Sequence, residues 1–84
     1  MKPVRLSAHA LSYTTRRGFT AAEVEDAIRT SPWQPAELAR LECSKDFAFA
    51  AFWNGKFYAA KRVRPVFVEE RDEIVVVTVY TYYF

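Results

Sequence analysis

The sequence predicts a single α+β domain over residues 1–84, in which two N-terminal helices pack on a mostly antiparallel β-sheet. Thr20 and Glu23 have the spacing of a capping box, which marks the start of a helix. Asn54-Gly55 is the dipeptide most typical of a two-residue β-hairpin turn. Residues 74–84 are all β-branched or aromatic, as expected of a strand. A chain of 84 residues, 51% of them hydrophobic, suffices for one compact core.

The N-terminal part of the chain predicts a short strand followed by two helices. Residues 4–7 form the strand, and the Ser7 hydroxyl can accept a hydrogen bond from the first turn of a helix over residues 8–17. Gly18 follows that helix, where glycine adopts a left-handed conformation at little cost. The capping box then begins a second helix over residues 21–30, and the next proline ends it.

The middle of the chain gives weaker signals. We expect a loop over residues 31–38, because two prolines interrupt regular structure there. Residues 38–45 partly alternate between apolar and polar side chains and predict a strand. The aromatic-rich residues 45–53 fit neither the helical nor the strand period.

A further strand is expected at residues 61–69. Pro65 lacks a backbone N–H, so this position should lie at a sheet edge or a bulge. A polar turn over residues 70–72 then allows the last strand to pair back antiparallel. The predicted element order is therefore β-α-α-β-(β)-β-β.

The last strand organises the predicted sheet. Strict alternation divides its side chains between two faces, with Ile74, Val76, Thr78, Tyr80 and Tyr82 on one and Val75, Val77, Val79, Thr81 and Tyr83 on the other. Both sets begin with apolar residues, so we expect a central strand that is covered on both faces at its start. Both sets then gain hydroxyl groups, which predicts either a wet rim of the sheet or a strand that runs from the core into a site.

Composition narrows the function classes. The net charge of +2 is only mildly basic and is weak support for nucleic-acid binding by itself. Cys43 is the only cysteine, so an internal disulfide is excluded, and we interpret this residue as a packing group in a reducing cytoplasm. The sequence has no cysteine–histidine–carboxylate cluster that would indicate a metal site, and no glycine-rich loop that would indicate a nucleotide cofactor. No apolar run is long enough for a signal peptide or a membrane span.

Several short stretches together resemble one protein family. They are Ser7-Ala8-His9-Ala10, Arg16-Arg17-Gly18-Phe19-Thr20, Glu23-Val24, Lys61-Arg62-Val63-Arg64 and Val75-Val76-Val77-Thr78-Val79-Tyr80. This pattern resembles domain-of-unknown-function family 4258, which is similar in fold to the RelE- and BrnT-like toxins. The resemblance implies a RelE-like β-α-α-β-β-β domain, metal-independent RNA cleavage, and a cognate antitoxin as partner.

Three residues are candidates for the chemistry of such a ribonuclease. His9, the only histidine, suits proton transfer because an imidazole titrates near neutrality, and it matches the histidine of the family's opening motif. Arg64 can stabilise charge on a phosphate, and Tyr80 can contact RNA or donate a proton. The alternative for His9 is a packing role between a helix and the sheet.

Further cations and one more tyrosine are candidates for RNA or phosphate binding, namely Arg16, Arg17, Lys61, Arg62 and Tyr82. In a strand, Arg62 and Arg64 would share a face and Lys61 would point to the other. The alternative is that these cations are solvated, at a helix end and on an edge strand, where they improve the helix dipole and discourage aggregation.

Two other functions compete with the RNA hypothesis. The aromatic-rich residues 47–58 predict a non-catalytic interaction module, either a degenerate toxin relative with a protein partner or a homodimer. The hydroxyl-lined end of the last strand predicts a small-ligand pocket. The RNA hypothesis is preferred because it also accounts for His9 and for the Arg62–Arg64 face.

Overall fold

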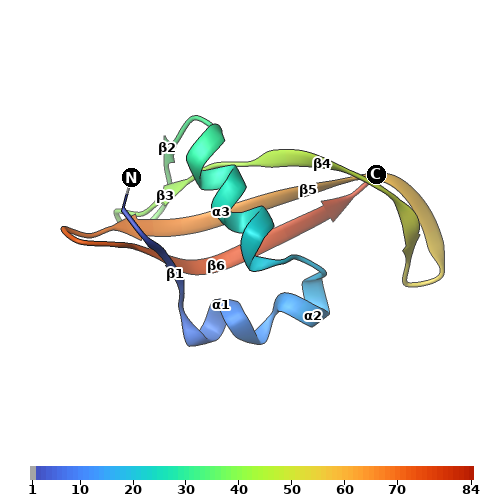
Figure 1. The fold of residues 1–84 in the computed structure, drawn as a ribbon, viewed down its shortest axis with the longest axis horizontal. Helices are drawn as coiled ribbons and strands as arrows, with labels where there is room; N and C mark the ends of the chain where they lie inside the picture. The colour runs from blue at the N-terminus through green and yellow to red at the C-terminus, as the bar shows by residue number, and fades with distance from the viewer. Residues whose placement is uncertain (1) are drawn as a thin grey trace.

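The computed structural model describes residues 2–84, which form an elongated α+β domain of 41 × 24 × 22 Å (Figure 1). Its elements in chain order are β1 (Val4–Leu6), α1 (Ala8–Ser12), α2 (Thr14–Arg17), α3 (Ala21–Thr30), β2 (Gln34–Pro35), β3 (Leu41–Glu42), β4 (Lys45–Trp53), β5 (Lys56–Glu69) and β6 (Ile74–Tyr83). The predicted α+β class and the mostly antiparallel sheet are therefore confirmed.

The six strands form one open sheet in the order β1-β6-β5-β3-β2, and β4 also pairs with β5. The last strand, β6, is central at its start, where it lies parallel to β1 and antiparallel to β5. Its second half extends beyond β1 and keeps only β5 as a strand neighbour. Beyond the end of β6, β4 and β5 continue as a two-stranded hairpin (Figure 1).

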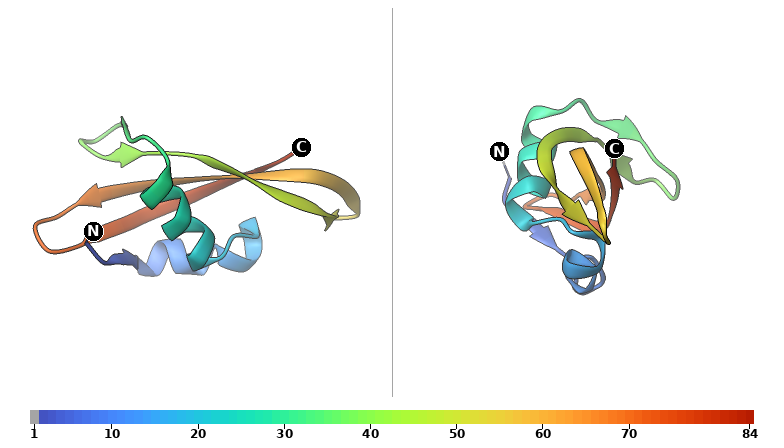
Figure 2. Two further views of the ribbon diagram at one scale, coloured as in Figure 1. Left: turned by 45° about the horizontal axis from the view of Figure 1, so that its top comes forward. Right: turned by 90° about the vertical axis from the view of Figure 1, so that its right-hand side faces the viewer.

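The helices cover one face of the sheet (Figure 2). Helix α3 crosses that face, and α1 and α2 lie beside the second half of β6, past the end of β1 (Figure 1). The core between the helices and the sheet is built from Ala10, Phe19, Val24, Ala27, Ile28, Cys43, Val63, Phe67, Ile74, Val76 and Val79. The opposite face carries no helix, and we call it the open face; Val75 and Val77 are only half-buried there. The prediction that β6 begins covered on both faces is therefore wrong.

Capping residues set the helix boundaries as predicted, with one difference. The Ser7 hydroxyl accepts a hydrogen bond from the amide of Ala10 at 3.1 Å, and the capping box of α3 is fully formed. The single helix expected over residues 8–17 is instead two short helices, α1 and α2. The break is at Tyr13, whose φ of −102° and ψ of 0° leave the helical region. Gly18 ends α2 with a φ of 72°.

The middle of the chain differs most from the sequence prediction. The strand expected over residues 38–45 is reduced to β3, because Leu38 and Ala39 both have a φ of 59° and form a tight turn. The segment 45–53, which had no clear period, is the regular strand β4 with an irregularity between Ala48 and Ala51. Exposure still alternates along β4 without interruption, with Phe47, Phe49 and Trp53 half-buried and Phe52 exposed, so the outward-facing Phe52 is what obscured the strand period.

The predicted hairpin turn is confirmed, whereas Pro65 lies within the sheet, at a gap between two partner strands and at neither a sheet edge nor a bulge of β5. Asn54 and Gly55 have φ values of 51° and 82°, as a type I′ hairpin turn requires. Pro65 faces the gap between β3 and β4 on the outer side of β5, where the Pro65 carbonyl accepts a hydrogen bond from Cys43 at 3.3 Å. The N–H that proline lacks is therefore not needed for the pairing of β5 with β6.

The predicted division of β6 between two faces is wrong after Val76. Phe67 pairs with Val76 and Val66 pairs with Thr78, so Val77 is an extra residue in a β-bulge. The bulge reverses the alternation, so Val79 is buried on the helix face together with Val76. Thr78, Tyr80 and Tyr82 consequently lie on the open face, and Thr81 and Tyr83 lie beneath the helices.

Candidate functional site

The open face brings two arginines of β5 beside two tyrosines of β6. Arg64 pairs in register with Tyr80, and Arg62 pairs with Tyr82. Residues that pair across two strands point to the same face. Four of the eight candidate residues from the sequence therefore lie together on the uncovered side of the sheet.

These side chains continue into a row in which cations and aromatic rings alternate. The guanidinium carbon of Arg17 lies 4.0 Å from the ring centre of Tyr13 and 5.1 Å from that of Tyr80. The guanidinium carbon of Arg64 lies 4.9 Å from the ring centre of Tyr80 and 5.8 Å from that of Tyr82. We call Tyr13, Arg17, Tyr80, Arg64 and Tyr82 the cation–aromatic strip. Such contacts hold each guanidinium in place while its N–H groups remain able to donate.

Arg17 joins the helical segment to the strip. Its Nη1 donates to the carbonyl of Val79 at 2.7 Å and to the hydroxyl of Thr78 at 3.3 Å. Both acceptors lie on the part of β6 that extends beyond β1, where no strand pairs with that edge. Arg16, one residue earlier, is exposed, and its guanidinium carbon lies 5.1 Å from the ring centre of Tyr13. Arg17 thus has a structural part in the strip, and Arg16 lies at its outer end.

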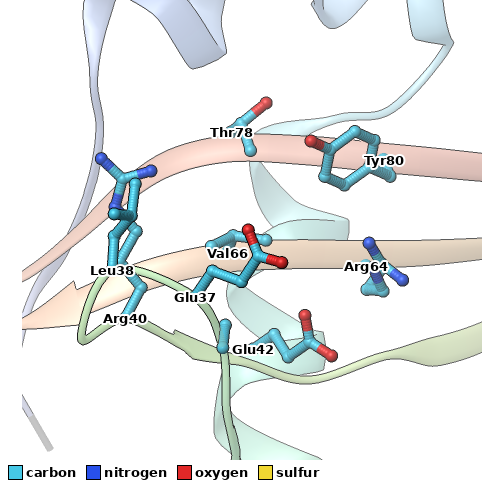
Figure 3. Close-up of a pocket in the computed structure, with 9 residues that line it drawn as sticks. Glu37, Leu38, Arg40, Glu42, Arg64, Val66, Thr78 and Tyr80 are labelled. Carbon is cyan, nitrogen blue, oxygen red and sulfur yellow. The ribbon is translucent and has the colours of Figure 1, made fainter.

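The strip borders a pocket of about 320 Å³ on the open face (Figure 3). Arg64, Thr78 and Tyr80 form its floor, and the β2–β3 turn and β3 contribute Glu37, Arg40 and Glu42. The pocket lies where the sequence suggested a hydroxyl-lined site. The buried Nε atom of Arg64 has no hydrogen-bond partner in the part of the chain that the structure describes. A buried donor without a partner is costly, and in folded proteins such atoms are frequently explained by a bound water, an ion or a functional role.

His9 does not line this pocket. It is exposed on α1, and its ring packs edge-on against Tyr13 with 4.9 Å between the ring centres. It is therefore connected to Arg64 through Tyr13, Arg17 and Tyr80. The structure brings His9 to the end of the strip and leaves it outside the group of side chains around Arg64.

Lys61 is separated from the other candidate residues. It points to the helix face, is 6% exposed, and its ammonium contacts Glu23 and the carbonyl of Gly18, each at 2.9 Å. The predicted opposite orientation of Lys61 and Arg62 is thus confirmed. Because both partners of Lys61 lie inside the fold, its ammonium is committed to holding α3 and the α2–α3 loop on β5.

Arg62 lies on the open face in a cross-strand ion pair. Its Nε contacts Asp46 at 2.7 Å, and its guanidinium carbon lies 5.4 Å from the ring centre of Phe84. The hydrogen bond from Arg62 lowers the pKa of Asp46, and the same bond raises the pKa of Arg62. Both side chains are about half exposed, so the pair contributes little stability and Arg62 is free to exchange partners.

Glu37, Arg40 and Glu42 were not predicted as site residues. Their sequence neighbours form no motif, and only the tight turn at Leu38 and Ala39 together with the pairing of Glu42 opposite Val66 places them beside Arg64. No pattern in the linear sequence could have revealed this arrangement.

The chain shows no metal site and no membrane helix in the part that the structure describes. Within residues 2–84, no three histidine, cysteine, aspartate or glutamate side chains gather in a way that could hold a metal ion. No helix in this range is long and apolar enough to cross a membrane. Cys43 is buried, and burial raises the pKa of its thiol to about 11.

Comparisons with models of protein families, with curated proteins and with solved structures give no match to this chain.

Proposed function

We propose that this domain binds single-stranded RNA along the cation–aromatic strip, as a RelE/BrnT-like domain, and that any RNA cleavage it performs needs no metal ion. The observation that carries this proposal is Arg64, whose guanidinium lies between two tyrosine rings and has a buried donor without a partner. Arginine held over aromatic rings beside a pocket suits phosphate binding, and exposed aromatic rings suit unpaired bases.

The element order supports the same proposal. The chain begins with a short strand, continues through helices and returns with antiparallel strands, the last of which pairs beside the first. This order agrees with the β-α-α-β-β-β arrangement that the resemblance implies, apart from the broken first helix and the short additional strands.

Cleavage would require a group that activates the 2′-hydroxyl and another that protonates the leaving oxygen. Arg64 is placed to stabilise charge on a phosphate in the pocket, and Tyr80 borders the same pocket. His9 lies beyond Tyr13, so we assign it to the far end of the RNA path and not to the phosphate at Arg64.

The test is binding of a fluorescently labelled, unstructured RNA, measured by anisotropy over a series of salt concentrations. Arg64→Ala should weaken binding about tenfold and lower the slope of log K against log salt by about 0.7. Arg71→Ala, an exposed arginine in the β5–β6 turn, is the matched control and should leave both values unchanged. The same RNA incubated with EDTA reports metal-independent cleavage. Equal affinities for the wild type and the Arg64 variant would contradict the proposal.

A second function is favoured by one separate observation. Phe52 and Phe57 face each other across the β4–β5 hairpin with 5.6 Å between ring centres, and they are 71% and 53% exposed. An exposed aromatic pair of this kind is typical of a protein contact, so an interaction module, with itself or with an antitoxin-like protein, is the alternative.

Sedimentation velocity across a hundredfold concentration range tests the homodimer form of this alternative. A dimer that forms through the hairpin should dissociate in the Phe52→Ala/Phe57→Ala double variant. Leu38→Ala removes an equally exposed apolar side chain, 79% exposed, from the β2–β3 turn and serves as the control. A wild-type chain that stays monomeric throughout would exclude the homodimer, and co-purification of a stable partner lost in the double variant would support a heterologous contact.

A further inference from the structure

The pocket beside Arg64 holds charges of both signs that do not pair with one another. Six of the ten carboxylates of the chain form ion pairs, namely Glu23, Glu25, Asp26, Asp46, Glu69 and Glu73. Glu37 and Glu42 form none within residues 2–84, nor do Arg40 and Arg64, although all four line one pocket. The pocket therefore offers both acceptors and donors to a ligand.

Glu42 is the carboxylate whose backbone is fixed by strand pairing. It lies in β3 opposite Val66 of β5 and is half-buried, whereas Glu37 is exposed on the β2–β3 turn. Glu42 and Arg64 also border a second hollow of about 100 Å³ beside Cys43. Figure 3 shows the Glu42 carboxylate on the same side of the sheet as Arg64 and Tyr80. A carboxylate held on a strand is suited to recognise a ligand edge with defined geometry.

A carboxylate in an RNA site needs a specific reason, because it repels phosphate. It accepts hydrogen bonds and cannot donate them, and its two oxygens favour two neighbouring donors in one plane. Among the four RNA bases, guanine alone presents two such donors side by side, the ring N1–H and the 2-amino group. Uracil has one N–H on this edge, and adenine and cytosine have a single amino group beside a ring acceptor.

We propose that this pocket binds a guanine nucleotide unit, with the guanine N1–H and 2-amino groups donating to Glu42 and the phosphate bound by Arg64. The proposal rests on the RNA-binding function for its biological setting, and it names the base that the site selects. The same chemistry is present in free guanosine 5′-monophosphate and in a guanosine within an RNA strand, so both are tested.

The first experiment measures binding of three free nucleotides by titration calorimetry or by chemical shift. Guanosine 5′-monophosphate should bind at least tenfold more tightly than inosine 5′-monophosphate, which lacks only the 2-amino group, because one hydrogen bond to a charged acceptor is lost. Adenosine 5′-monophosphate should bind no better than the inosine nucleotide. Glu42→Gln should abolish the preference, since an amide presents only one acceptor. Glu70→Gln, an exposed glutamate in the β5–β6 turn, should preserve it.

The second experiment uses uridine heptamers that carry one central guanosine, inosine or adenosine. A guanosine preference of about tenfold that Glu42→Gln removes would support the RNA source. Binding of the free guanine nucleotide alone, with the same Glu42 dependence, would keep the guanine pocket and reject RNA as its source. RNA binding that depends on Arg64 but is equal for all three heptamers would overturn the guanine proposal and leave the RNA function intact. Absence of binding to every nucleotide and heptamer would overturn both.

Discussion

Replacing Gly18 with alanine should destabilise the domain by about 3 kcal/mol. Gly18 has a φ of 72°, and a Cβ added there would lie 2.1 Å from the Tyr83 hydroxyl and 2.7 Å from the Trp53 ring. The left-handed conformation alone costs alanine about 1 kcal/mol relative to glycine. Tyr83 would also have to leave its present position, where its hydroxyl donates to the carbonyl of Arg17 at 2.9 Å and its ring stacks on Trp53 at 4.9 Å. Losing that hydrogen bond and that aromatic pair costs roughly 1 kcal/mol each.

Gly55→Ala is a matched control for this estimate. Gly55 has a similarly left-handed φ of 82°, but an added Cβ would have no atom within 4 Å. Its replacement should therefore cost only the conformational term of about 1 kcal/mol. Urea denaturation followed by circular dichroism measures both free energies of unfolding. Equal losses in the two variants would refute the inference that Tyr83 and Trp53 pack on Gly18, whereas a difference of about 2 kcal/mol would support it.

Lys61→Met should lower the free energy of unfolding by about 3 kcal/mol, because it leaves Glu23 without its buried partner. Urea denaturation measures this loss, and a change below about 1 kcal/mol would contradict the structural role of the ion pair. Cys43, whose pKa is raised by burial to about 11, should resist alkylation by iodoacetamide at pH 8 in the folded protein and react readily in urea, as mass spectrometry can show. Deleting Val77 should cost only about 1–2 kcal/mol, because removal of the bulge residue keeps all other side chains on their present faces. Deleting Val79 should cost about 1–3 kcal/mol more than deleting Val77, because closing the bulge would then put the Thr78 hydroxyl at the buried position that Val79 fills. Comparable stability of the two deletions, measured by thermal denaturation, would contradict the assigned bulge.

Local sequence signals predicted the structure correctly at positions where the residue type has a single structural role. The Ser7 cap, the Thr20–Glu23 capping box and the Asn54–Gly55 turn all appear as predicted, because each satisfies backbone groups or dihedral angles within a few residues. The prediction of one continuous helix over residues 8–17 was wrong. Tyr13 breaks that helix, and its ring packs against Arg17 and His9.

The sequence identified most of the residue types in the candidate site, but it could not show which of them lie side by side. Arg62, Arg64 and the tyrosines were identified from their chemistry, but Glu42 enters the site only through the pairing of a two-residue strand with β5. Lys61 was distinguished from Arg62 by simple alternation, and its burial under α3 follows from the position of Glu23 in the first turn of that helix. Long-range pairing of short strands has no signature in a single sequence, so this part of the site could not be predicted.

The bulge at Val77 determines which side chains share the open face with Arg64. With strict alternation, Tyr80 and Tyr82 would lie on the same face as Val76, beneath the helices, and Val79 would be exposed. Strand β5 has no compensating irregularity at this point, so Arg64 would then stand opposite Val79 and Arg62 opposite Thr81. One extra residue therefore buries Val79 and places a tyrosine beside each arginine at two successive pairs. The strip and the core depend on the same irregularity, which is why an alternation rule that identifies the strand correctly still assigns its functional face incorrectly.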